Sequence, residues 1–462
     1  MALGAGILES LRQALGDDVV LDPATNDITA RRRDLSFEGT APVLAVVLPR
    51  DTDQVSKAMR LCHEAGVAVT PQGGLSGLAG GAVPVAESVL ISTERMRAVE
   101  ELDPAAQTLT VQAGVVLETI QNTAADAGFF FPVDLGGRGS AQAGGLASTN
   151  AGGNCVLRYG MMREVILGME VVLPDGTVIT SLNKMIKNNA GYDLKQMFIG
   201  AEGTLGVITR LVLRLYPAPQ ATCTGLVACA AYDDVLKLLD RCRRGFGSGL
   251  TAFECMWADF YRLGTDAYGR PAPLPHGHGF YVIVETQGAD QDADNTRFET
   301  VIGEAMEDGA ALDAVIARSS RETTALWAIR DTPGDYSKVL NPAINFDVSL
   351  SVGRIGEFAA ECHVKLAARW GDIHDVYFGH IADSNLHISA RLVPGHIEPK
   401  AVKDIVYGCV GAFGGSISAE HGIGIDKRDY LHHSRSPEEI ALMRRVKAAL
   451  DPAGLINPGK VF

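Results

Sequence analysis

The chain has 462 residues, 47% of them hydrophobic and 21% charged, which is enough to form the cores of two or three globular domains. Its formal net charge of −14 argues against nucleic acid or an anionic membrane as a partner, because both require a basic surface. The eight cysteines are scattered without a Cys-x-x-Cys pair, which argues against a disulfide framework or an iron–sulfur site and favours reduced thiols.

The N-terminal residues predict a helix and not a targeting signal. Ile7, Leu8, Leu11 and Leu15 form an apolar stripe at helical spacing, without the basic flank and apolar core of a signal peptide. No apolar run in the sequence is long enough to span a bilayer. We therefore expect a cytoplasmic protein without a membrane span.

An alternation of strands and helices follows and leads into a glycine-rich loop. Residues 42–50 predict a strand, residues 51–66 a helix with Asp51 at its N-cap, and residues 67–70 a buried strand. Further strands are expected over 89–94 and 108–112, and a further helix over 117–127.

The loop Pro71–Gly81 contains five glycines in eleven residues. Glycine lets bare backbone approach a ligand, and a loop of backbone N–H groups with the Ser76 hydroxyl suits a phosphate or pyrophosphate. The alternative is a glycine-rich turn that binds nothing. Two more glycine-rich regions follow over 135–153 and 198–206, and none of the three contains a dinucleotide G-x-G-x-x-G or a Walker A motif.

A second α+β domain is expected after residue 219. Amphipathic helices are predicted over 232–244, 297–308 and 352–370, and strands over 280–285 and 344–351. A last amphipathic helix is predicted over 437–450.

A histidine-containing hairpin is expected near the end of this domain. Ala382–Asn385 is a turn-forming tetrapeptide between two strand-forming runs. A turn centred between residues 383 and 384 would place His380 directly opposite His387, with their Cβ atoms about 5 Å apart. Two imidazoles at that distance can share a divalent metal, and Glu420 or the adjacent His421 offers a third ligand. For each histidine alone, an ordinary core or surface role is the alternative.

With these motifs placed, the chain resembles the FAD-linked oxidoreductases of the vanillyl-alcohol oxidase type, in the branch of D-lactate, glycolate and D-2-hydroxyglutarate dehydrogenases. The likeness runs from about Pro42 to Phe462. It is carried by Thr149–Gly153, Leu157–Gly160, Asn189–Lys195, Gly379–Ile381 and Ser418–Gly424.

The resemblance implies an α+β fold in three parts. Residues 1–217 are expected to form a PCMH-type FAD-binding domain of two α+β subdomains. Residues 218–436 are expected to form a substrate and metal domain with an antiparallel sheet, and residues 437–462 to return to the FAD domain. Since no histidine lies in the implied FAD loops, we expect non-covalent FAD. The implied FAD residues are Pro71, Gln72, Gly73, Gly74, Leu75, Ser76, Gly77, Asp134, Ser140, Gly144, Gly145, Thr149, Asn150, Gly152, Glu202, Gly203, Val207, Ile208 and Asn457.

The resemblance also implies the chemistry of the second site. His380, His387 and Glu420 would bind Zn²⁺ or Mn²⁺, His421 would be the general base, and Arg330 would hold the substrate carboxylate. The expected reaction is oxidation of a D-2-hydroxy acid with hydride transfer to FAD. An electron-transfer flavoprotein or a quinone is the expected acceptor, and a homodimer the expected assembly.

Three positions depart from the enzymes that use D-2-hydroxyglutarate. Where those enzymes have Thr, Lys and Asn, this chain has Gly334, Asn345 and Ser389. Because the Lys carries a positive charge, recognition of the second carboxylate is in question, and Arg391 or Lys338 could supply the charge instead.

The first expectation is D-2-hydroxyglutarate, with D-lactate or another acid with a less charged tail as the alternative. A non-catalytic electron-transfer flavoprotein subunit and a zinc hydrolase are rival functions. The first would not need the histidines, and the second would leave the glycine loops unexplained and lacks H-E-x-x-H.

Overall fold

The computed structural model describes residues 2–332, 340, 342–371, 373–391 and 398–462, which form two compact units. The first unit contains residues 1–153, 160–218 and 420–462, and the second contains residues 154–159 and 219–419. The chain therefore returns to the first unit at Glu420, earlier than the residue 437 expected from the sequence. No helix in the described ranges combines the length and hydropathy required to cross a membrane.

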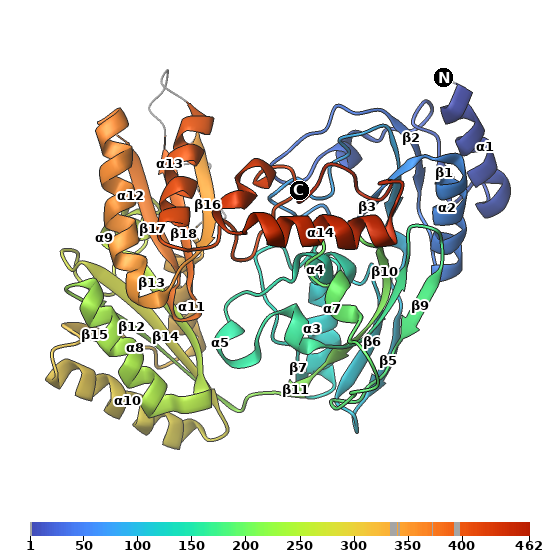
Figure 1. Cartoon of the computed structure of the whole chain (residues 1–462). Helices are drawn as coiled ribbons and strands as arrows, with labels where there is room; N and C mark the ends of the chain where they lie inside the picture. Colours follow the sequence, from blue (N-terminus) through green and yellow to red (C-terminus); the bar gives the residue numbers. More distant parts are fainter. Residues whose placement is uncertain (1, 333–339, 341, 372, 392–397) are drawn as a thin grey trace. The chain divides into compact units, whose positions relative to one another are not determined.

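The first unit begins with a small sheet whose order is β1-β2-β4-β3. Strands β2, β4 and β3 run parallel, as the predicted β–α–β unit requires. Asp51 caps the intervening helix by accepting a hydrogen bond from the Gln54 N–H at 2.9 Å. Ile7 and Leu11 of the N-terminal helix lie in this subdomain's core. The elements are α1 (Ala2–Leu15), β1 (Val20–Leu21), β2 (Val43–Val47), α2 (Thr52–Ala65), β3 (Ala68–Gln72) and β4 (Ser88–Ser92) (Figure 1).

A second subdomain of the first unit is built on an antiparallel sheet of order β5-β6-β10-β8-β9. Its long strand β10 contributes side chains to the cores of both subdomains. Val207 packs in the core of the first subdomain and Ile208 in that of the second. Two consecutive strand residues face opposite sides, so β10 joins the two subdomains. The elements are β5 (Val99–Asp103), β6 (Thr108–Gln112), α3 (Leu117–Asp126), α4 (Ala143–Thr149), β8 (Ile166–Val172), β9 (Val178–Ser181), α7 (Lys195–Phe198) and β10 (Val207–Arg214).

The C-terminal segment completes the first unit. Helix α14 (Pro437–Leu450) has the predicted bounds and is followed by a turn that brings Ile456 beside Val69 of β3. Asp451 organises this turn: its carboxylate accepts from Lys447 Nζ at 2.6 Å and from the N–H groups of Leu455 and Ile456 at 3.0 and 2.9 Å. Burial lowers the pKa of Lys447, while the Asp451 carboxylate opposes that shift.

Replacing Asp451 by Ala is expected to lower the free energy of unfolding of the first unit by about 3–5 kcal/mol, because it leaves the buried Lys447 charge without its carboxylate. Urea unfolding monitored by the fluorescence of bound FAD is the measurement. Asp429 is the matched control, since its side chain is 81% exposed and its replacement should change the free energy by no more than about 0.5 kcal/mol. Equal effects of the two substitutions would contradict a structural role for Asp451.

The second unit is a mixed domain on a seven-stranded sheet of order β15-β12-β14-β13-β17-β18-β16. All of its strand pairs are antiparallel. The strands are β12 (Ala221–Cys229), β13 (Leu250–Trp257), β14 (Phe280–Gly288), β15 (Asp313–Ile316), β16 (Ala343–Ser349), β17 (His374–His380) and β18 (Asn385–Arg391) (Figure 1).

Helices cover both faces of this sheet. One face packs against α9 (Ala258–Asp266) and α11 (Ser320–Arg330), whose Phe260 and Ile329 share a core with Met256 and Phe378 of the strands. The remaining helices are α8 (Tyr232–Phe246), α10 (Gln291–Glu307), α12 (Ile355–Trp370) and α13 (Pro399–Ala412). Helix α10 begins six residues before the predicted start, because Asp290 caps it by accepting from the N–H groups of Asp292 and Ala293.

Candidate functional site

The histidine hairpin forms, but its predicted register is wrong by two residues. His387 pairs with Phe378, and the turn contains a 3-10 segment over Ile381–Asp383 followed by Ser384 with a left-handed backbone, φ 78°. Because side chains alternate with a period of two, a shift of two leaves both histidines on one face. They are diagonal neighbours with ring centroids 5.5 Å apart.

Two buried carboxylates flank this histidine pair. Glu254 on β13 pairs with His380 on β17, and Asp347 on β16 pairs with His387 on β18. Since β13, β17, β18 and β16 are consecutive in the sheet, the four side chains form a row of carboxylate, histidine, histidine and carboxylate. The Glu254 and Asp347 side chains are 1% and 0% exposed. Neither of them was among the predicted site residues.

Hydrogen bonding sets the tautomer of His380. Its Nδ1 lies 2.6 Å from Glu254 Oε1, and its Nε2 lies 3.0 Å from Arg330 Nη2. A guanidinium group can only donate, so Nε2 carries the lone pair and Nδ1 carries the proton. A neutral imidazole oriented by a carboxylate is the form in which histidine binds a metal.

Arg330 is held at the same place by Glu254. Arg330 ends α11, its Nε donates to Glu254 Oε2 at 2.8 Å, and its guanidinium lies 5.3 Å from the Phe378 ring centroid. Burial by itself would raise the pKa of Glu254, but His380 and Arg330 lower it to about 2. Glu254 is therefore ionised at neutral pH.

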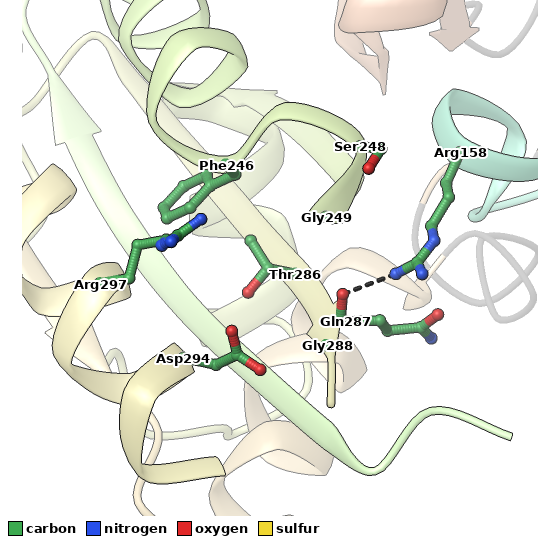
Figure 2. A pocket seen from close by; sticks show the side chains of 9 residues that line it. All are labelled: Arg158, Phe246, Ser248, Gly249, Thr286, Gln287, Gly288, Asp294 and Arg297. Carbon is green, nitrogen blue, oxygen red and sulfur yellow. Dashed lines mark hydrogen bonds between the residues drawn. The ribbon is translucent and has the colours of Figure 1, made fainter. Parts of the chain in front are cut away.

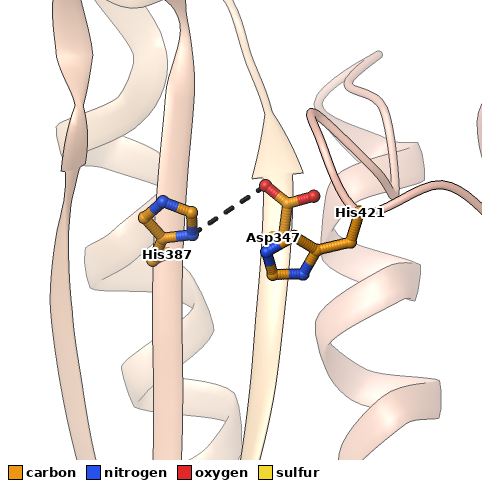
Figure 3. A group of neighbouring side chains, drawn as sticks. All are labelled: Asp347, His387 and His421. Atoms are coloured by element: carbon orange, nitrogen blue, oxygen red, sulfur yellow. Dashed lines mark ion pairs between the residues drawn. The ribbon is translucent and has the colours of Figure 1, made fainter. Parts of the chain in front are cut away.

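Asp347 connects three segments of the second unit. Its Oδ1 accepts from Asn385 Nδ2 at 2.8 Å and lies 3.8 Å from His387 Nδ1. Figure 3 shows His387 and Asp347 on neighbouring strands with this ion pair drawn. The Oδ2 atom of Asp347 accepts from the N–H of Ala419 at 3.1 Å. Ala419 is the residue immediately before Glu420 and His421, so Asp347 anchors the chain where the two predicted functional residues begin.

The predicted tail-recognition residues lie on the same two strands. Asn345 on β16 pairs with Ser389 on β18, and Ser389 Oγ donates to Asn345 Oδ1 at 2.7 Å. Both side chains are uncharged. Arg391 is two residues beyond Ser389 on β18 and partly exposed. Gly334 and Lys338 lie outside the described residues.

Glu420 and His421 begin the last segment of the first unit. Glu420 Oε1 accepts from the N–H of Gly153 at 2.9 Å. Glu202 holds the next residues, because its carboxylate accepts from the N–H groups of Ile423 and Gly424 at 2.7 and 2.8 Å. Burial raises the pKa of Glu202, against these hydrogen bonds and the nearby Lys427 and Lys460. Glu202 thus contacts the 420–424 segment through its side chain, a role that sequence reasoning did not identify.

The three glycine-rich regions come together in the first unit. A Cβ on Gly74 would lie 1.7 Å from Ser140 O, and a Cβ on Gly73 would lie 3.6 Å from Gly145 Cα. Gly203 of the third region lies beside Pro71 and Asn457. Gly145 itself faces open space, because a Cβ there would have no atom within 4 Å. Close backbone crossings next to open space suit a phosphate-containing ligand.

Two buried polar atoms of these loops have no hydrogen-bond partner among the described residues, namely Gln72 Oε1 and Asn457 Oδ1. The Asn457 side-chain NH₂ group makes two hydrogen bonds, because Nδ2 donates to Glu202 O at 2.8 Å and to Gly81 O at 3.1 Å. Buried polar atoms are normally satisfied, so both oxygens are suited to a ligand's donors. Left-handed backbone at Leu75, Asn150, Glu202 and Asn457 also concentrates in these loops.

The other predicted FAD residues occupy the same unit in different ways. Asp134 bridges Gly153 through the backbone and pairs with Arg138 at 3.0 Å. Thr149 Oγ1 donates to Gly145 O, and Asn150 Oδ1 accepts from the Arg163 N–H. Val207 and Ile208 lie in the two hydrophobic cores, and the glycine-rich regions of the same unit contain Ser76, Gly77, Gly144 and Gly152.

The second unit contains a polar pocket. It is lined by Arg158, Phe246, Ser248, Gly249, Thr286, Gln287, Gly288, Asp294 and Arg297, as Figure 2 shows. Arg158 Nη1 donates to Gln287 O at 2.6 Å, and Tyr159 Oη donates to Gln287 Oε1 at 2.9 Å. These bonds fasten the segment 154–159 to β14. None of the predicted site residues lines this pocket.

Comparison with known proteins gives concordant matches over the chain. Residues 43–181 match the model of an FAD binding domain, and residues 218–461 match the model of the C-terminal domain of FAD linked oxidases. The mitochondrial D-2-hydroxyglutarate dehydrogenase of Bos taurus is 37% identical over 433 residues, covering 92% of this chain and 78% of the relative. A Schizosaccharomyces pombe protein provisionally named a mitochondrial D-lactate dehydrogenase is 36% identical over 456 residues, covering 96% and 86%. The structure of p-cresol methylhydroxylase with substrate bound has a TM-score of 0.79 at 16% identity, covering 100% of this chain and 97% of that chain, a likeness of fold alone.

Proposed function

The chain belongs to the FAD-linked oxidases, in the family of D-2-hydroxyglutarate and D-lactate dehydrogenases, and we propose that it oxidises D-2-hydroxyglutarate in a reaction that requires a divalent metal. FAD is its cofactor and a small 2-hydroxy acid its substrate class. The observation that carries the metal proposal is the row Glu254–His380–His387–Asp347, in which a buried carboxylate lies beside each of two imidazoles on one face of the sheet.

The metal would be held by His380 through Nε2, by His387 and by Glu420. These nitrogen and oxygen ligands suit Zn²⁺ or Mn²⁺. Arg330 would bind the C1 carboxylate of the substrate, for which its planar fork is well matched. His421 would accept the hydroxyl proton. The metal supplies polarisation of the hydroxyl, and FAD supplies the acceptor for the hydride from C2.

The alternative substrate is D-lactate or another acid with a less charged tail. The neutral Asn345–Ser389 hydrogen bond, at positions where the dicarboxylate enzymes carry Lys and Asn, favours this alternative. Arg391, on the same strand, is the residue that would bind a second carboxylate if D-2-hydroxyglutarate is the substrate. An acceptor such as an electron-transfer flavoprotein or a quinone, a cytoplasmic location and a homodimer complete the proposal.

Anaerobic reduction of the bound flavin by D- and L-2-hydroxy acids, with and without a chelator, tests this function. We expect D-2-hydroxyglutarate to reduce the flavin fastest, and the chelator to prevent reduction. Faster reduction by D-lactate would make D-lactate the proposed substrate and leave the proposed mechanism unchanged. If metal-replete protein is reduced by none of the acids, the electron-transfer subunit becomes the better explanation.

A further inference from the structure

We propose that Glu254 is the positioning residue of this site, and that it fixes both the tautomer of His380 and the place of Arg330. The inference rests on the proposed metal-dependent function and extends it to a residue that neither the sequence motifs nor the comparisons assign. Glu254 belongs to β13, a strand on which no metal-binding or substrate-binding residue was predicted.

The first support is the division of its two oxygens. Oε1 accepts from His380 Nδ1 at 2.6 Å, and Oε2 accepts from Arg330 Nε at 2.8 Å. One carboxylate thus orients a proposed metal ligand and a proposed substrate ligand together. Its side chain is 1% exposed, so water does not compete for either bond.

The second support is that the arrangement leaves no freedom to the imidazole. With Nδ1–H committed to Glu254, only Nε2 of His380 can bind a metal. That atom now accepts from Arg330 Nη2 at 3.0 Å. Metal binding at Nε2 and this hydrogen bond exclude one another, because the nitrogen has one lone pair. Occupation of the metal site would therefore release Nη2 for the substrate carboxylate, while Nε stays bound to Glu254.

A neighbouring residue provides the matched control. Glu285 on β14 is also a buried carboxylate, 9% exposed, with two hydrogen bonds, from Thr224 Oγ1 and Trp327 Nε1, both at 2.8 Å. Neither of these hydrogen bonds involves His380 or His387. Glu254→Gln and Glu285→Gln therefore remove the same charge from the same sheet, and only the first touches His380.

The test is the affinity of wild-type and variant FAD-loaded protein for Mn²⁺ and Zn²⁺, measured by titration against a chelator of known affinity. We expect Glu254→Gln to weaken metal binding about 10–100-fold, the usual effect of losing an outer-shell partner, and Glu285→Gln to leave it within about twofold. Wild-type affinity in Glu254→Gln, or equal weakening in both variants, would overturn the inference.

A second measurement covers the case in which Glu254→Gln fails to fold. The ¹⁵N spectrum of the wild-type histidines, with His380 assigned by substitution, should show the Nδ1–H tautomer for this residue in the metal-free protein. An Nε2–H tautomer would overturn the inference without any variant. Absence of metal binding by the wild type is a separate result, because it would remove the metal from the proposed function itself.

Discussion

Replacing His421 by Ala is expected to slow reduction of the flavin by a D-2-hydroxy acid by about 10²–10⁴-fold, the usual contribution of a general base. FAD should remain bound, because the loops that would hold it are formed by other residues of the first unit, such as Gly74, Gly145 and Asn457. Anaerobic stopped-flow absorbance of the flavin measures the first effect, and the flavin-to-protein ratio measures the second.

His432→Ala is the control for this experiment. His432 is exposed, lies in the same unit, and is tilted against His433 with ring centroids 4.2 Å apart. Its removal should leave the rate of flavin reduction unchanged. A normal rate in His421→Ala would take the proton-accepting role away from His421 and leave the other site residues as candidates.

Replacing His380 by Ala is expected to reduce bound metal more severely than the 10–100-fold loss of affinity that is typical for outer-shell partners, because a direct ligand is removed. It also removes one hydrogen-bond partner of the buried Glu254 and leaves its hydrogen bond with Arg330. Metal content after dialysis, by inductively coupled plasma mass spectrometry, gives the stoichiometry. Flavin content should not change.

His374→Ala is the control on the same strand. His374 begins β17 and is exposed, whereas His380 ends that strand and is buried. The pair therefore separates loss of a ligand from loss of a strand histidine. Unchanged metal content in His380→Ala would refute the hairpin site, and equal losses in both variants would point to damage to the strand.

Local patterns predicted the fold well where one segment determines its own structure. The N-cap at Asp51, the apolar stripe of α1 and the bounds of α14 follow from neighbouring residues and are confirmed. The α+β class with a PCMH-type FAD domain was implied by the family resemblance, and the comparisons confirm it. The hairpin register was wrong because the 3-10 segment over Ile381–Asp383 depends on turn geometry that composition does not encode.

The flanking carboxylates could not be found in this way. Glu254 is 126 residues from His380 along the chain, and a Glu inside an apolar strand carries no local signal of a histidine partner. Asp347 likewise binds residues that are distant along the chain, because it accepts hydrogen bonds from both Asn385 and Ala419. A useful signal is an acidic residue at an inward-facing strand position, because burying it requires a partner. The predicted site residues themselves remain predictions until the variants are measured.

The return of the C-terminus to β3 has a consequence for how the chain folds during synthesis. Val69 pairs with Ile456, and Asn457 reaches Glu202 and Gly81, so the first unit contains contacts that span most of the sequence. Such contacts are slow to form because closing a long loop costs entropy. The second unit, apart from residues 154–159, is one continuous segment that is synthesised before residue 420. We therefore expect the second unit to become compact first. The flavin loops of the first unit can complete their contacts only after the last residues of the chain have been synthesised.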